Sequence, residues 1–166
     1  MFRLQKTAFL IDIYLSKNYK EYFKFEKYKY GPYDHALEVI CQKIKEFQMY
    51  YNVANTEEAY DIAYKKLASS SVDSKLKLFT PIIDKATKYV NNIESDTDLE
   101  CITTVLFIIK EKGTVPESDI VNDFKMWSED KANRFSDIDI TKGIQYLYTT
   151  GMIEKSLMGY TLSTSL

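Results

Sequence analysis

The sequence predicts a mainly α-helical protein with a small β contribution. Of its 166 residues, 45% are hydrophobic and only five are glycine and three proline, which is typical of a compact, helix-leaning chain. Apolar residues also recur at helical spacing through most of the sequence. We expect one compact domain made of two lobes, residues 1–92 and residues 93–166.

The N-terminal lobe is predicted to begin with a buried helix over residues 3–16, whose apolar residues cover most of its circumference. Gln5 and Lys6 lie on its narrower polar side. Residues 19–28 alternate roughly and predict a short strand or extended segment. Pro32 suits the first turn of a helix, so we expect a helix from there to about Tyr50. Further helices are expected over residues 59–67, 73–79 and 82–91, with Pro81 opening the last.

Gly31 and Pro32 form a turn crowded by three tyrosines, Tyr28, Tyr30 and Tyr33, and we call residues 27–33 the elbow. Glycine adopts backbone angles closed to other residues, and proline fixes its own φ near about −65°. We therefore interpret Gly31 and Pro32 as a structural motif. The tyrosines have two interpretations: their rings pack the elbow onto the first helix, or they anchor a binding partner.

The C-terminal lobe is predicted to hold three helices and a terminal hairpin. Its strongest helical pattern covers residues 99–111 and ends at Gly113, and we expect it to be the central core helix. Helices are expected over residues 117–130 and 138–148, followed by a hairpin over residues 152–162 with its turn near Met158-Gly159. The lobe is thus expected to be winged-helix-like, a topology that does not by itself indicate a function.

Charge is divided unevenly along the chain. Residues 1–90 hold 15 Lys and Arg against 11 Asp and Glu, whereas residues 91–166 hold 7 against 13. Duplex DNA binding needs several Lys or Arg contacts to phosphates, but the predicted recognition helix over residues 139–150 offers one base, Lys142. The electrostatics argue against DNA binding by this lobe and leave only the basic N-terminal half for it. The acidic lobe indicates a basic partner or an ordinary solvated surface.

No catalytic constellation is evident in the sequence. His35 is the only histidine, and no local motif brings a serine or cysteine nucleophile to it. Nucleotide-binding and zinc motifs are absent. Cys41 and Cys101 lie in predicted helices and are expected to be buried free thiols. We therefore expect a non-enzymatic protein without cofactor or metal, soluble and cytoplasmic because no signal peptide or membrane-spanning run is evident.

Three segments carry a family resemblance. The first is residues 2–10 (FRLQKTAFL), and the second is the elbow with Leu37, Val39 and Ile40 behind it. The third comprises Glu100, Thr103, Thr104, Val105, Trp127, Phe135, Tyr146, Leu147, Gly151, Met152 and Ile153. Together they resemble the opening helix, the Lys-Tyr-Gly-Pro-Tyr turn and the closing helical lobe of the C-terminal domain of the DarG antitoxins.

The resemblance implies a domain that binds and neutralises a DarT-type toxin, an NAD-dependent DNA ADP-ribosyltransferase, by resembling its DNA substrate. The macrodomain with which that family removes ADP-ribose from DNA has no counterpart in this sequence, so that activity is not implied. A Leu-Gln-Lys helix followed by Gly-Pro also occurs in the Panacea (SocA-like) antitoxin domains. A Panacea-like antitoxin or adaptor with another partner therefore stays open, as does a winged-helix DNA-binding regulator.

A DNA mimic places carboxylates where phosphates would lie, and residues 94–139 hold 12 acidic and 5 basic residues. Neither nucleic acid nor a membrane is expected as a direct partner. Each carboxylate alone is also typical of a solvated surface. The candidate toxin-binding residues are Tyr28, Tyr30, Tyr33, Glu117, Asp119, Asp123, Glu129, Asp130, Asp137 and Asp139.

Overall fold

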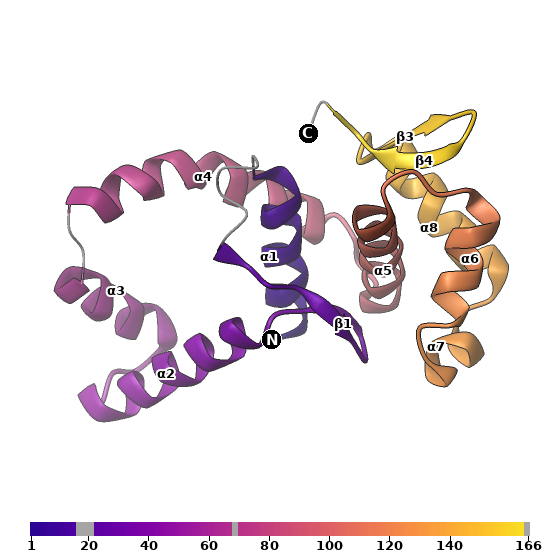
Figure 1. Ribbon diagram of the computed structural model, residues 1–166. Helices are drawn as coiled ribbons and strands as arrows, with labels where there is room; N and C mark the ends of the chain where they lie inside the picture. The colour runs from indigo at the N-terminus through magenta and orange to yellow at the C-terminus, as the bar shows by residue number, and fades with distance from the viewer. Residues whose placement is uncertain (16–21, 68–69, 165–166) are drawn as a thin grey trace.

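The computed structural model describes residues 1–15, 22–67 and 70–164, and it confirms a mainly α-helical protein with two small antiparallel hairpins (Figure 1). The helices are α1 (Phe2–Tyr14), α2 (His35–Tyr51), α3 (Thr56–Leu67), α4 (Ser70–Asn91), α5 (Asp96–Lys112), α6 (Glu117–Lys125), α7 (Glu129–Arg134) and α8 (Asp137–Thr149). The strands are β1 (Glu26–Tyr28), β2 (Gly31–Tyr33), β3 (Ile153–Ser156) and β4 (Gly159–Leu162). No helix in these ranges is both long and apolar enough to cross a bilayer.

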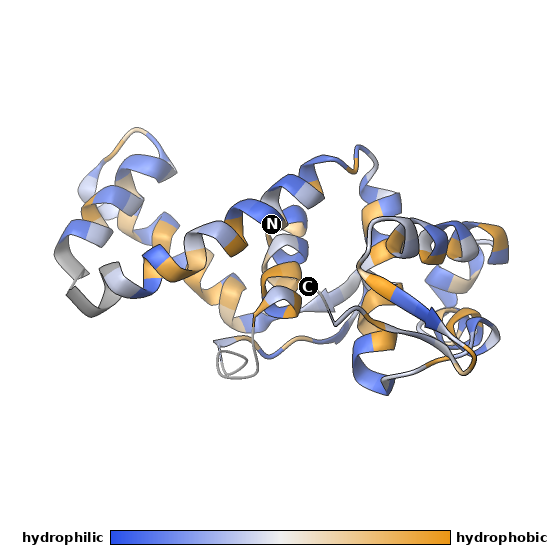
Figure 2. Ribbon diagram, turned by 90° about the horizontal axis from the view of Figure 1, so that it is seen from above, coloured by the Kyte–Doolittle hydropathy of each residue, from blue (hydrophilic) through white to orange (hydrophobic). Residues whose placement is uncertain are grey.

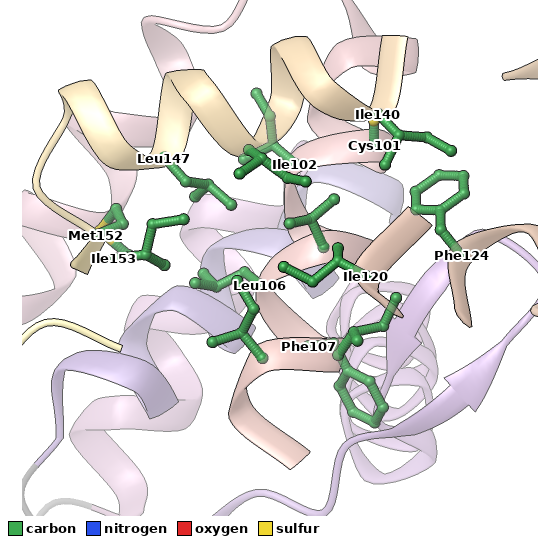
Figure 3. Close-up of a cluster of buried hydrophobic side chains, with 14 of the residues drawn as sticks. Cys101, Ile102, Leu106, Phe107, Ile120, Phe124, Ile140, Leu147, Met152 and Ile153 are labelled. Carbon is green, nitrogen blue, oxygen red and sulfur yellow. The ribbon is translucent and has the colours of Figure 1, made fainter. Parts of the chain in front are cut away.

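Helix α5 is the centre of the hydrophobic core. Every residue from Leu99 to Ile109 is buried, because α1, α6, α8 and the β3–β4 hairpin surround the helix. In Figure 3, Leu106 of α5, Ile120 of α6 and Leu147 of α8 lie in one cluster. A helix buried on all sides must be apolar on most sides, which explains its sequence.

The C-terminal lobe has the winged-helix-like arrangement that the sequence predicts, with α5, α6 and α8 followed by the β3–β4 hairpin (Figure 1). Val115 and Tyr160 exchange two backbone hydrogen bonds of 2.8 Å, which tie the segment before α6 to the hairpin. The single helix expected over residues 117–130 is instead two helices. It breaks before α7 because the Ser128 side chain accepts a hydrogen bond from the Lys131 amide and caps a new helix.

The expectation that Pro32 opens a helix is wrong. Pro32 lies in β2, paired with Lys27 of β1, and α2 begins at His35. The helix starts there because the Asp34 carboxylate accepts a hydrogen bond from the Ala36 amide (2.7 Å). Residues 26–28 of the expected extended segment form β1, while residues 19–21 lie outside the described ranges.

The expectation that Pro81 starts a helix is also wrong. Pro81 lies inside α4, which continues from Ser70 to Asn91. A proline removes one backbone donor from a helix. The carbonyl that Pro81 leaves without its backbone donor is that of Lys77, four residues before it, while the Thr80 hydroxyl donates to the neighbouring Leu76 carbonyl at 2.7 Å.

Helices α2 and α3 and the first half of α4 extend away from the core as an arm (Figure 1). No residue of α2 is buried, and Val39 and Ile40 are more than half exposed. Hydrophobic positions nevertheless recur along these helices (Figure 2). Cys41 of α2 was expected to be buried but is only half-buried, because α2 extends away from the core. Cys101 of α5 is buried as expected.

Replacing the fully buried Leu106 with alanine should lower the free energy of unfolding by about 2–5 kcal/mol, because the change removes apolar contacts and leaves a cavity. Leu157→Ala is the matched control, since Leu157 is fully exposed at the hairpin turn and its loss should change stability by less than about 0.5 kcal/mol. Urea denaturation measures both. Equal losses in the two variants would contradict the central position of α5.

Candidate partner-binding surface

The elbow is held from α1 by two buried polar side chains. The Lys6 ammonium donates to the carbonyls of Tyr30 (2.5 Å) and Pro32 (3.0 Å). The Gln5 amide donates to the Asp34 carbonyl and accepts from the Asp34 amide, both at 2.9 Å. The sequence places Gln5 and Lys6 on a narrow polar side of the helix, and the structure buries both because the backbone of the elbow needs partners away from water.

Two further contacts fix the elbow. Gly31 has a φ of +95°, and a Cβ at this position would lie 2.9 Å from Thr104 Oγ1, so the elbow packs directly on α5. The Trp127 indole N–H donates to the Tyr28 carbonyl at 2.8 Å. Helices α1 and α5 and the connection between α6 and α7 therefore all hold one short hairpin.

The tyrosine rings of the elbow gather at the surface. The Tyr28 and Tyr33 ring centroids lie 4.8 Å apart, and the His35 ring lies 5.6 and 5.1 Å from them. Tyr28 and Tyr30 are 50% and 46% exposed. An apolar pocket of about 190 Å³ lies among Phe2 and the three tyrosines. The Tyr28 and Tyr33 rings thus lie against each other, the three tyrosines border α1 at this pocket, and much of the surface of Tyr28 and Tyr30 faces solvent.

Six of the seven candidate carboxylates lie in the first turn of a helix. They are Glu117 and Asp119 in α6, Glu129 and Asp130 in α7, and Asp137 and Asp139 in α8. A negative charge there interacts favourably with the positive end of the helix dipole, so the fold itself accounts for these positions. The Ser136 hydroxyl and amide also donate to Asp139, and these hydrogen bonds lower the pKa of its carboxyl.

Ion pairs offset part of this negative charge. Asp123 lies 2.5 Å from Lys112, Asp130 lies 2.9 Å from Arg134, and Asp137 lies 3.3 Å from Lys125. Glu117, Asp119, Glu129 and Asp139 have no such ion pair among the described residues. Of these four, Glu117, Asp119 and Asp139 still accept hydrogen bonds from Tyr160, Ser118 and Ser136, so their charges lack a paired cation but not a donor.

A buried ionic network that sequence reasoning missed lies beside the elbow. Glu100 Oε1 lies 2.5 Å from Lys131 Nζ and 2.7 Å from an Arg134 guanidinium nitrogen. Lys131 is fully buried, and its ammonium lies 5.3–5.8 Å from the ring centroids of Phe124, Trp127 and Phe135. The sequence does contain a signal for this network. Glu100 lies inside the otherwise apolar run of α5, and a carboxylate buried there needs a cation beside it.

A larger cavity of about 640 Å³ lies where residues 92–95, the start of α5 and the α8 helix converge. Cys101 and Gly143 line it, and a Cβ on Gly143 would lie 3.1 Å from the Cys101 sulfur. Burial raises the pKa of the Cys101 thiol to about 12, so the thiol stays protonated and unreactive near neutral pH. Among the carboxylates proposed from the sequence, Asp139 lines this cavity.

His35 lies exposed at the start of α2, with Nδ1 4.0 Å from the Glu38 carboxylate. The described part of the chain contains no group of three His, Cys, Asp or Glu side chains suited to a metal ion.

Comparisons with protein-family models, with curated proteins and with solved structures find no match to the chain. A functional argument for this protein therefore depends on its residues and their geometry.

Gly31→Ala should lower the free energy of unfolding by about 2–4 kcal/mol, because the new Cβ meets Thr104 and φ is positive. Gly151→Ala isolates the second effect, since Gly151 also has a positive φ (+73°) but no atom lies within 4 Å of its Cβ position. That control should cost only about 1–2 kcal/mol. Thermal and urea unfolding compare the two variants, and equal losses would exclude a close approach of the elbow to α5.

Burial, followed by the charge of Lys131, lowers the pKa of Lys6 to about 7, against an opposing effect of Glu100. Between pH 7 and 9 the unfolded chain keeps a proton on Lys6 that the folded chain releases. The free energy of unfolding therefore rises with pH by about 1 kcal/mol per unit in this window. The stability of the wild type relative to Lys6→Met should rise accordingly in urea titrations at pH 7, 8 and 9. A constant difference would mean that Lys6 stays protonated in the fold.

Proposed function

We propose that the chain is a non-catalytic antitoxin domain that acts in the cytoplasm, binds a DarT-type DNA ADP-ribosyltransferase toxin and neutralises it by occupying its DNA groove. The observation that carries this proposal is a spatial convergence of the three segments that resemble DarG. Lys6 of the first and Thr104 and Trp127 of the third all contact the elbow, which is the second. Separate stretches support a resemblance more strongly when their residues contact one another.

The acidic lobe supports the same function. Residues 91–166 carry 13 acidic and 7 basic side chains, and a groove that binds DNA presents Lys and Arg to phosphates. The Ser136–Asp139 capping box also holds one carboxylate in a fixed orientation, as a phosphate mimic requires. Electrostatic complementarity speeds association and makes it salt-sensitive. The half-exposed Tyr28 and Tyr30 would slow dissociation by burying their rings in the partner.

The winged-helix-like lobe favours a second candidate, a DNA-binding regulator. In that function α8 would be the recognition helix, but Lys142 is its only Lys or Arg, and Asp137 and Asp139 lie in its first turn. Contacts to several phosphates need more cations on one surface, so the charge distribution favours the antitoxin. A Panacea (SocA-like) antitoxin or adaptor would share these features and differ in its partner.

Added to a DarT-type toxin with NAD and substrate DNA, the chain should abolish DNA ADP-ribosylation at about equimolar amounts, because it competes for the DNA groove. Transfer of labelled ADP-ribose to DNA measures the effect. Undiminished DNA ADP-ribosylation at a stoichiometric excess of the chain over the toxin would contradict the proposal. Salt-dependent binding of the chain alone to a labelled duplex would favour the regulator, and capture of an unrelated neighbouring toxin would favour the Panacea-like antitoxin.

Two variants refine this test. Asp119→Asn with Glu129→Gln neutralises two carboxylates without ion pairs, and it should slow association and weaken its salt dependence. Glu57→Gln with Asp61→Asn makes the same charge change on the exposed surface of α3 and should leave both unchanged. Stopped-flow or biosensor kinetics at two salt concentrations separate the outcomes. Equal effects of the two pairs would assign the salt dependence to net charge alone.

A further inference from the structure

We propose that the 640 Å³ cavity between α5 and α8 receives one lysine or arginine side chain of the bound protein partner. The inference rests on the proposed function, and it adds the place and the chemistry of a contact that the sequence does not indicate. The volume of the cavity falls within the range of about 300–1,000 Å³ that is usual for ligand pockets.

The walls of the cavity suit the alkyl part of a long cationic side chain. Ile93, Ile102 and Phe135 line it together with the backbone of Gly143, where the absence of a side chain leaves α8 close to α5. Lysine and arginine bury their methylene groups against such apolar surface and keep the charged end near polar groups.

The charges around the cavity leave two carboxylates without a counterion. Arg134 is already engaged with Glu100 (2.7 Å) and Asp130 (2.9 Å). Lys142 also lines the cavity one turn from Asp139 on α8; its charge contributes to the lowered pKa of that carboxyl after the Ser136 hydrogen bonds, but it forms no ion pair among the described residues, so three acids and two bases line the cavity. The remaining acids are Glu94 and Asp98, which are exposed and whose carboxylates have no ion-pair or hydrogen-bond partner among the described residues.

Other ligand classes fit the cavity less well. An anion at the start of α5 would meet the negative charges of Asp96 and Asp98 in the first turn. The Asp98 amide is also already used, because it donates a hydrogen bond to the Ser95 side chain. A metal ion lacks a group of three suitable ligands in the described ranges. A ligand that needs a thiolate is disfavoured, because Cys101 stays protonated. A guanidinium or ammonium group with an alkyl stem satisfies both the carboxylates and the walls.

The partner's side chain, rather than a free amine, is the occupant that charge complementarity selects. A protein that binds DNA presents Lys and Arg along its groove to contact phosphates. Glu94 and Asp98 lie in the acidic lobe that would face this groove. Insertion of one such side chain would fix the register of the complex, because the cation meets the carboxylates of Glu94 and Asp98 in only one position of the partner.

Agmatine, a guanidinium on a four-carbon stem, tests the chemistry of the cavity directly. At millimolar concentrations it should shift the amide resonances of Gly143 and Tyr146, which line the cavity, and glutarate should not. Glu94→Gln with Asp98→Asn should abolish the shifts, whereas Glu57→Gln with Asp61→Asn should retain them. Thermal unfolding confirms that both variants are folded. Absent shifts in the wild type, or equal shifts in all proteins, overturn the inference.

A catalytically inactive DarT-type toxin tests the partner. Glu94→Gln with Asp98→Asn should weaken its binding by roughly 10–100-fold, mainly through faster dissociation, and the α3 control pair should bind like the wild type. If the wild type binds and the cavity variant binds equally well, this inference fails and the proposed function stands. If the wild type does not bind, the proposed function fails, and the partner named here fails with it.

Discussion

The structure depends on how the carbonyl groups of the elbow find hydrogen-bond donors. A turn that packs against a core helix directs backbone oxygens away from water, and each buried oxygen needs a donor. For Tyr30 and Pro32 one ammonium, that of Lys6, serves both oxygens, which places a cation in the interior. A buried cation is costly unless an opposite charge and hydrogen bonds compensate it. Burial and the charge of Lys131 therefore lower the pKa of Lys6 to about 7, and the charge of Glu100 opposes this shift only in part.

Glu100 connects the elbow to the C-terminal lobe. Its carboxylate binds Lys131 and Arg134 of α7 directly, and its charge also favours the protonated form of Lys6 on α1. Burial lowers the pKa of Lys131 although Glu100 opposes that change, and three aromatic rings face its ammonium. One acid thus acts on three cations from two helices. The position of α7 and the geometry of the elbow are consequently coupled through the same buried charge.

Local sequence rules predict the parts of this fold that local chemistry determines. The apolar run of α5, its end at Gly113 and the hairpin turn next to Gly159 follow from periodicity and turn chemistry. The rules fail where contacts with residues distant in the sequence determine the local structure. Pro32 suits a helix start, yet pairing with Lys27 and a hydrogen bond from α1 place it in a strand. The burial of Lys6 and the cavity beside Gly143 depend on contacts between distant segments, which a single-sequence pattern does not contain.

The acidic character of the C-terminal lobe has separate physical origins that can be assigned residue by residue. Carboxylates in first helical turns stabilise those helices, so the fold alone justifies Glu117, Asp119 and their counterparts in α7 and α8. Asp123 is accounted for by its ion pair with Lys112. Glu94 has neither role: it precedes α5 and lines the larger cavity, and its carboxylate has no ion pair among the described residues. An exposed carboxylate of this kind stays solvated in the free protein, so pairing with a partner's cation, as proposed above, would break no ion pair of the fold.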